Sequence, residues 1–237
     1  MAFDPGNRWT AARGGAIPQA DIDVGLRAHM LRVYNYMAAG LALTGIVAYL
    51  GSGFYASIVG TPLQWVVAFA PLVFIFPLSA GLQRFSLGAA QALFWVFAAL
   101  VGLSLSYLFL RYTGTSIART FFITAATFAG TSLYGYTTRR DLTSVGSFCT
   151  MGLYGLILAS IVNFFLGSAG LNFAIDLIGI IVFVGFTAYD SQWIKEIYYE
   201  GDSDVVAGKK AIFGALHLYL DFLNIFVFLM NLAGDRR

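Results

Sequence analysis

Five small or polar residues recur at helical spacing in the last apolar segment of the chain. They are Gly214, His217, Asp221, Asn224 and Asn231, separated by three, four, three and seven positions, so they share one face of a helix. A carboxylate halfway along a membrane-crossing helix costs roughly 2.5 to 3.5 kcal/mol. We therefore expect this face to meet protein or water. Asp221 could bind a proton or contact a cation there, with His217 and Asn224 as candidates for lining the pathway.

A second carboxylate, Asp190, ends the preceding apolar segment in the sequence AYDSQ. If both segments meet the same membrane surface, Asp221 lies about ten residues, or ~15 Å, deeper than Asp190. A tilted helix, or an earlier start of the last helix, would close that gap. Two carboxylates ~4 Å apart repel by ~4 kcal/mol at an effective dielectric near 20. Such a pair would share one proton and respond to pH.

Arg84, which follows the second apolar segment in LQRFS, is a competing partner for either carboxylate. The predicted pH-sensing and gating residues are thus Asp190, Asp221 and Arg84. Each also has a simpler structural interpretation. Asp221 could hydrogen-bond a neighbouring helix, and Arg84 could anchor the chain at the membrane surface. His217 and Asn224 could likewise be polar contacts between helices.

The elements that must position these residues are seven apolar segments, each long enough to cross a ~30 Å hydrocarbon core. Pro71 and Pro77 should kink the second of them. The stretch Lys195 to Lys210 is charged and is predicted to be a substantial loop. The segments run from Leu31 to Leu50, Trp65 to Leu82, Leu87 to Leu110, Ile117 to Tyr136, Val145 to Leu166, Leu171 to Tyr189 and Ala211 to Ala233.

The composition requires a membrane. Of 237 residues, 59% are hydrophobic and 11% are charged, against roughly 25% charged in ordinary soluble domains. The predicted fold class is an all-α membrane protein of seven transmembrane helices, with the C-terminal helix central and surrounded by the other six. Residues 1–28 form a polar N-terminal tail, and residues 29–237 form the transmembrane domain.

The distribution of Lys and Arg predicts a cytoplasmic N-terminus, because basic residues favour the cytoplasmic side. With that orientation ten basic residues lie inside and four lie outside. We see no basic patch suited to nucleic acid. The inner set is Arg8, Arg13, Arg27, Arg32, Arg84, Arg139, Arg140, Lys195, Lys209 and Lys210, and the outer set is Arg111, Arg119, Arg236 and Arg237.

Three segments, in this order, resemble the Bax inhibitor-1 family of membrane proteins, also called the transmembrane Bax inhibitor motif family. They are TFFITAATFAGTSLYGYTTRRDLTSVGSF from Thr120, AYDSQ from Ala188, and LYLDFLNIF from Leu218. The resemblance extends from about Gly25 to the end of the chain. The short ending GDRR differs from the longer charged tails of many eukaryotic members. It therefore favours a bacterial-type member in the inner membrane.

The resemblance implies seven helices around a central last helix and a pH-sensitive calcium leak governed by an aspartate pair. On the motif match those aspartates are Asp190 and Asp221. In bacterial members it also implies association with a membrane-bound ATP-dependent protease, and in eukaryotic members suppression of cell death. Calcium would be the transported ion. We expect no cofactor and no resident metal, since two aspartates are too few for a calcium site of six to eight oxygens.

Other function classes fit the sequence less well, and we expect no enzyme. Membrane zinc hydrolases need about three His ligands, whereas this chain has His29 and His217 alone. No serine nucleophile stands out beside a positioned His. Cys149 is the single cysteine and is interpreted as a packing residue. The alternative that stays open is a non-conducting regulatory protein that binds and modulates the ATP-dependent protease.

Overall fold

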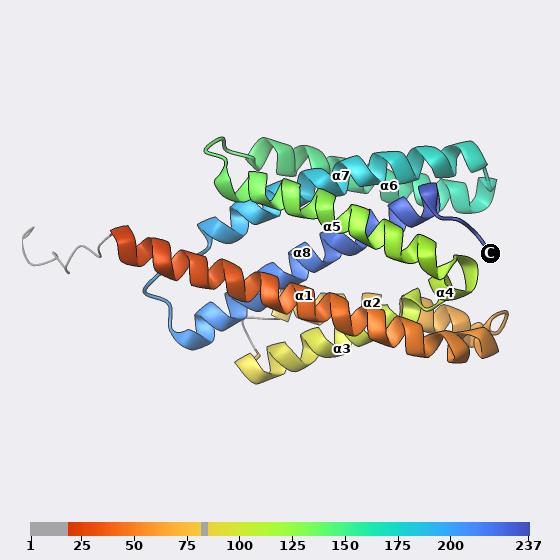
Figure 1. Cartoon of the computed structure of the whole chain (residues 1–237), viewed down its shortest axis with the longest axis horizontal. Coiled ribbons are helices and arrows are strands. Elements are labelled where there is room, and N and C mark those ends of the chain that lie inside the picture. Colours follow the sequence, from red (N-terminus) through yellow and green to blue (C-terminus); the bar gives the residue numbers. More distant parts are fainter. Residues whose placement is uncertain (1–18, 82–84) are drawn as a thin grey trace, which may run out of the picture.

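The computed structural model describes the backbone of residues 19–81 and 85–237 and the side chains of residues 24–74 and 85–237. Within these residues the chain forms helices and no strand, which confirms the all-helical class (Figure 1). The helices are α1 (Gln19–Ile58), α2 (Pro62–Gly81), α3 (Leu87–Leu105), α4 (Tyr107–Arg111), α5 (Gly114–Thr137), α6 (Thr143–Leu166), α7 (Ala169–Glu196) and α8 (Asp204–Ala233).

The predicted apolar segments lie on helices as far as the structure describes them, with Leu82 of the second segment outside the described residues, and the third segment is divided between α3 and the short α4. Within the described residues, five helices are long and apolar enough to cross a membrane: α1, α3 with α4, α6, α7 and α8. Seven crossings therefore stay a prediction. The start of α1 and the C-terminus lie at opposite ends of the bundle (Figure 1). The helix α1 begins at Gln19, so part of the polar segment 1–28 is helical.

Hydroxyl side chains set where four helices begin. Ser86, Thr113, Ser168 and Ser203 precede α3, α5, α7 and α8, and each accepts a hydrogen bond from a backbone N–H in the first turn. Such caps satisfy donors that the helix itself leaves unpaired. After the C-terminal residue of α6, Gly167 adopts the left-handed conformation, with φ of 61°, which glycine adopts without steric cost.

The prediction of a long loop from Lys195 to Lys210 is wrong. The loop is short because α7 continues to Glu196 and α8 begins at Asp204. Ser203 caps α8 and Asp204 occupies its first turn, where a negative charge opposes the helix dipole. Lys210 then bonds back across the loop, donating to the Ile197 carbonyl at 2.8 Å and to the Asp202 carboxylate at 2.5 Å. The charged residues of this stretch therefore stabilise the first turns of α8 and hold the short loop before it.

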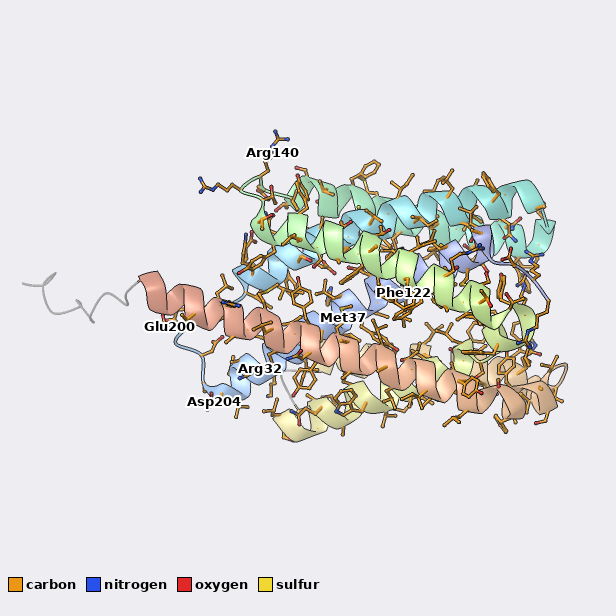
Figure 2. All side chains as sticks on the ribbon, viewed as in Figure 1. Arg32, Met37, Phe122, Arg140, Glu200 and Asp204 are labelled. Atoms are coloured by element: carbon orange, nitrogen blue, oxygen red, sulfur yellow. The ribbon has the colours of Figure 1, made fainter. Side chains whose placement is uncertain are left out.

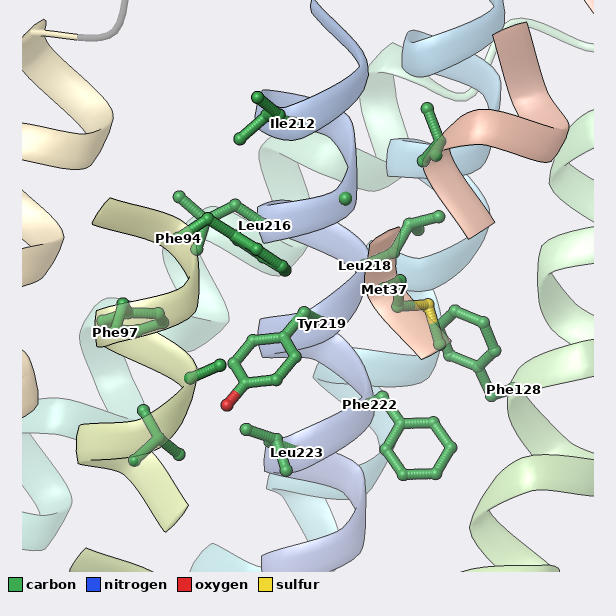
Figure 3. Packing of buried hydrophobic residues seen from close by; sticks show 14 of the residues in the cluster. Met37, Phe94, Phe97, Phe128, Ile212, Leu216, Leu218, Tyr219, Phe222 and Leu223 are labelled. Carbon is green, nitrogen blue, oxygen red and sulfur yellow. The ribbon is translucent and has the colours of Figure 1, made fainter. Parts of the chain in front are cut away.

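The helix α8 packs against α1, α3, α5 and α7, while α2 lies mainly on α3 and α6 lies on α7. In the most apolar stretch of α8, 61% of the residues are buried, against 17 to 39% in the corresponding stretches of the other four apolar helices. Figure 3 shows Tyr219 directed toward Phe94 and Phe97 of α3, with ring centroids 6.0 and 5.9 Å away. On another side of α8, the ring centroid of Phe222 lies 5.6 Å from that of Phe128 of α5. The predicted ring of six helices around α8 stays a prediction.

The outer surface of the bundle is apolar. Phe122, Phe164 and Phe165 are 70%, 75% and 80% exposed, and Figure 2 shows side chains of this kind along the length of the bundle. Charged side chains such as Arg140 and Glu200 gather at one end (Figure 2). An exposed apolar surface of this extent is suited to lipid.

The last residues of the chain are held by the segment between α4 and α5. The Thr113 N–H donates to the Asp235 carbonyl at 3.1 Å, and the Arg237 N–H donates to the Arg111 carbonyl at 3.0 Å. The Asp235 N–H donates to the Ser116 hydroxyl at 2.9 Å. The short ending therefore closes the end of the bundle opposite to the start of α1.

Candidate functional site

The register between α7 and α8 brings the predicted acidic residues together. These helices run antiparallel, and Asp190 meets His217, whose Nδ1 lies 2.9 Å from Asp190 Oδ2. Asp221 follows one turn beyond His217. The ~15 Å separation considered from the sequence does not arise, because α7 continues six residues beyond Asp190 to Glu196. His217, and not Ala211, therefore lies opposite Asp190.

The same register continues along the two helices. A Cβ on Gly179 would meet the Phe228 ring at 2.6 Å, so α7 approaches α8 closely there. Further along, the Asn231 amide donates to Asp176 at 3.3 Å. In all three pairs the residue numbers add to the same value, as expected of straight antiparallel helices. The α7–α8 contact therefore has a polar pair on each side of the close approach at Gly179.

Asp221 is the acid with the least compensation. It is 4% exposed, and its Oδ2 atom is enclosed without a hydrogen-bond partner among the described residues. Its carboxyl group interacts electrostatically with that of Asp190. Cys149 of α6, also buried, lies within electrostatic range of both. A buried carboxyl group without a partner is costly in an apolar medium, so Asp221 is the residue of this site that packing explains least.

His217 connects the buried acid pair to a more accessible surface. Its side chain is 38% exposed, whereas that of Asp190 is 7% exposed. Trp193 and Phe213 hold the imidazole, with ring centroids 5.2 and 4.8 Å from it. From the sequence His217 was only a pathway-lining candidate. It is in fact a direct partner of Asp190.

The remaining predicted site residues divide between structural contacts and undescribed positions. Asn224 donates to the Leu220 carbonyl of its own helix at 2.8 Å. Asn231, which donates to Asp176, also accepts a hydrogen bond from the Tyr112 hydroxyl at 3.2 Å. Arg84 lies outside the described residues.

The three buried polar residues of AYDSQ each bind a different part of the molecule. Asp190 binds His217, and Ser191 binds Ser132 of α5 at 2.7 Å. The Gln192 side chain accepts from the Leu142 N–H and donates to the Arg140 carbonyl, both at 2.8 Å. The motif therefore joins α7 to α8, to α5 and to the α5–α6 loop. The sequence indicated a role for its aspartate alone.

A chain of hydroxyl groups was also missed by the sequence interpretation. Ser191 donates to the Thr187 carbonyl at 2.7 Å. Ser191 therefore accepts a hydrogen bond from the Ser132 hydroxyl. Ser132 in turn accepts one from the Tyr34 hydroxyl, 2.7 Å away. The chain links α1, α5 and α7. Isolated hydroxyls in apolar segments carry little signal in a sequence, because each can also bond within its own helix.

The site provides few ligands for a resident metal. Among the described residues no three His, Cys, Asp or Glu side chains converge. Two carboxylates and an imidazole are fewer ligands than the six to eight oxygens of a calcium-binding site.

These features define a class, a polytopic membrane protein with a buried acid pair between its last two long helices. Residues 26–237 match the family model described as inhibitor of apoptosis-promoting Bax1. The chain therefore belongs to the Bax inhibitor family of integral membrane proteins.

Similar proteins occur across bacteria. The chain is 53% identical over 218 residues to an uncharacterised protein of Rickettsia prowazekii, with 91% of this chain and 92% of the relative covered. It is 43% identical over 219 residues to inner membrane protein YbhL of Escherichia coli, covering 90% and 94%. A membrane protein of Streptococcus pyogenes is 32% identical over 218 residues, covering 90% and 94%.

Proposed function

We propose that this protein forms a pH-responsive pathway for cations, with Ca²⁺ as the transported ion, and that Asp190 and Asp221 gate it. The observation that carries the proposal is the buried Asp221 carboxyl beside Asp190, with one oxygen unpaired among the described residues. When both groups are charged their repulsion, of order 4 kcal/mol at ~4 Å, opposes the contact between α7 and α8. Binding of one proton removes it.

The pathway would cross the membrane along α8, within seven crossings made by α1, α2, α3 with α4, α5, α6, α7 and α8. The alternating direction of successive long helices supports this arrangement (Figure 1). The end at which α1 starts would be cytoplasmic in the bacterial inner membrane, because the basic residues Arg27, Arg139, Arg140 and Lys195 lie toward it. The acid pair would then lie nearer the cytoplasmic end.

Flux through reconstituted protein tests this function. Purified protein in calcium-loaded liposomes should release Ca²⁺ at a rate that changes between about pH 5 and pH 8. Asp221→Asn should flatten that pH dependence, because it removes one titrating group from a coupled pair. Asp204→Asn is the matched control, since it makes the same exchange at the exposed start of the same helix.

The pair itself is tested by combining Asp190→Asn with Asp221→Asn. If the two groups share a proton, the shifts of the pH midpoint should be non-additive, and additive shifts would contradict the pairing. Flux no greater than that of empty liposomes at every pH would contradict conduction. It would favour instead a non-conducting regulator of a membrane-bound ATP-dependent protease.

A further inference from the structure

The helices α1 and α5 pass in front of α8 without packing closely on each other (Figure 1). A cavity of about 660 Å³ lies between them at the end where α1 starts. Arg27, Met30, Leu31 and Tyr34 of α1 line it on one side, and Tyr34 contacts Ser132 of α5 across it. A second cavity, of about 510 Å³, continues between the same helices beyond Met37. We call the first cavity the α1–α5 groove.

The walls of the α1–α5 groove are apolar. Met30 and Phe128 are buried at its base, and Leu31 and Leu133 form its edges, 53% and 62% exposed. The hydroxyls of Tyr34 and Ser132 are hydrogen-bonded to each other, so they do not need a polar group from a ligand. In a bilayer no water fills an apolar recess that opens between two lipid-facing helices. A hydrocarbon chain is the occupant that such walls accept.

The mouth of the groove is cationic. Arg27 lines it, and Lys195 lies against Tyr136, another lining residue. The Lys195 ammonium donates to the Tyr136 carbonyl at 2.9 Å and lies 5.9 Å from the centre of its ring. No acidic side chain is among the residues that line this cavity in the described part of the chain. Two cations at the end of an apolar recess match a phosphate attached to a hydrocarbon chain.

The length of the groove also fits. From Arg27 to Tyr34 is seven residues of helix, or ~10 Å, within one leaflet of a ~30 Å hydrocarbon core. We propose that the α1–α5 groove binds one anionic phospholipid, with its head group at Arg27 and Lys195 and one acyl chain along Met30 and Phe128. The site requires a membrane but does not depend on the proposed cation pathway.

Native mass spectrometry of the purified full chain tests this site. The probe is an equimolar mixture of phosphatidylglycerol and phosphatidylcholine with identical acyl chains, titrated into the detergent-solubilised protein. The wild-type protein should retain one phosphatidylglycerol in preference to phosphatidylcholine. Arg27→Gln should lower that preference about five-fold, since a basic residue near a membrane surface contributes about that factor toward anionic lipid. Arg236→Gln, at the other end of the bundle, should leave it unchanged.

Ala129→Trp separates the acyl-chain contact from the head-group contact, because Ala129 lines the groove and the indole would fill it. This variant should lose the retained lipid of either head group while keeping the wild-type melting temperature. Equal retention of the two lipids by the wild-type protein would overturn the proposal. So would an unchanged preference in Arg27→Gln, or retention of a second copy of the chain in place of lipid.

Discussion

At the scale of single residues, the protein pairs almost every buried polar side-chain atom among its described residues, and the exceptions are Asp221 Oδ2 and His29 Nε2. His217 binds Asp190, Ser191 binds Ser132, and Gln192 binds the α5–α6 loop. Asp221 Oδ2 is enclosed without such a partner. Because unpaired polar groups are expensive in an apolar interior, this exception is the strongest residue-level argument for a functional site.

A buried pair of hydroxyls, Thr44 and Tyr219, gives a prediction about stability. The Thr44 hydroxyl donates to the Ala98 carbonyl at 2.9 Å, so it accepts the hydrogen bond from the Tyr219 hydroxyl, 2.6 Å away. Thr44→Val leaves the Tyr219 hydroxyl buried without a partner and should cost about 1–3 kcal/mol. Tyr219→Phe leaves Thr44 bonded to Ala98 and should cost less, about 0.5–1.5 kcal/mol.

Thermal unfolding of the two variants in detergent micelles measures this difference. Thr44→Val should lower the melting temperature more than Tyr219→Phe. The reverse order would mean that the hydroxyl of Tyr219 is satisfied in another way, and that Thr44 does not join α1 to α8.

At the scale of helices, close approach depends on particular glycines. A Cβ on Gly135 of α5 would collide with the Ala188 carbonyl oxygen and lie 2.8 Å from its carbonyl carbon. Backbone atoms of α7 cannot rotate away as a side chain can. Gly135→Ala should therefore force α5 away from the AYDSQ segment and cost about 1–3 kcal/mol.

Gly130 provides the matched control in the same helix, since no atom lies within 4 Å of the position where its Cβ would be. Gly130→Ala should leave the melting temperature unchanged or raise it slightly, because alanine favours a helix more than glycine does. Equal losses of melting temperature in Gly130→Ala and Gly135→Ala would mean that the α5–α7 contact is not limiting.

The sequence predicts these helices well because long apolar segments have few alternatives in a membrane. It predicts the site less completely. The burial of Asp221 follows from its place halfway along α8, and the AYDSQ motif indicates Asp190. The partner of Asp190 could not be predicted, because it depends on how far α7 continues beyond Asp190 and so on the register of α7 against α8. Ser203 and Asp204, which begin α8, look like loop residues in a charged stretch until the cap is seen.

At the scale of the whole molecule, α8 lies between two groups of helices, α1 to α4 on one side and α5 to α7 on the other. The end of the chain joins these groups where α4 meets α5. Removal of residues 235–237 should free the Thr113 N–H, which donates to the Asp235 carbonyl. Amide hydrogen exchange at Thr113 should then accelerate by about five- to ten-fold, as the loss of one hydrogen bond permits.

Exchange in peptides covering residues 111–119 measures this effect, with Tyr112 as internal control because its N–H bonds to Leu108 within α4. Arg119→Ala should change little, since the Arg119–Asp235 ion pair is exposed on both sides and such pairs contribute ~0–1 kcal/mol. Unchanged exchange at Thr113 after truncation would show that α5 begins stably without the chain end.

The directed hydroxyl chain from Tyr34 through Ser132 to Ser191 ends on the Thr187 carbonyl. A carbonyl oxygen has no hydrogen to hand on, so stepwise hopping of protons along this row stops there, short of the Asp190 carboxyl. In the proposed function, protons would therefore reach the carboxyl pair by a different route. His217, 38% exposed and in contact with Asp190, would provide that route.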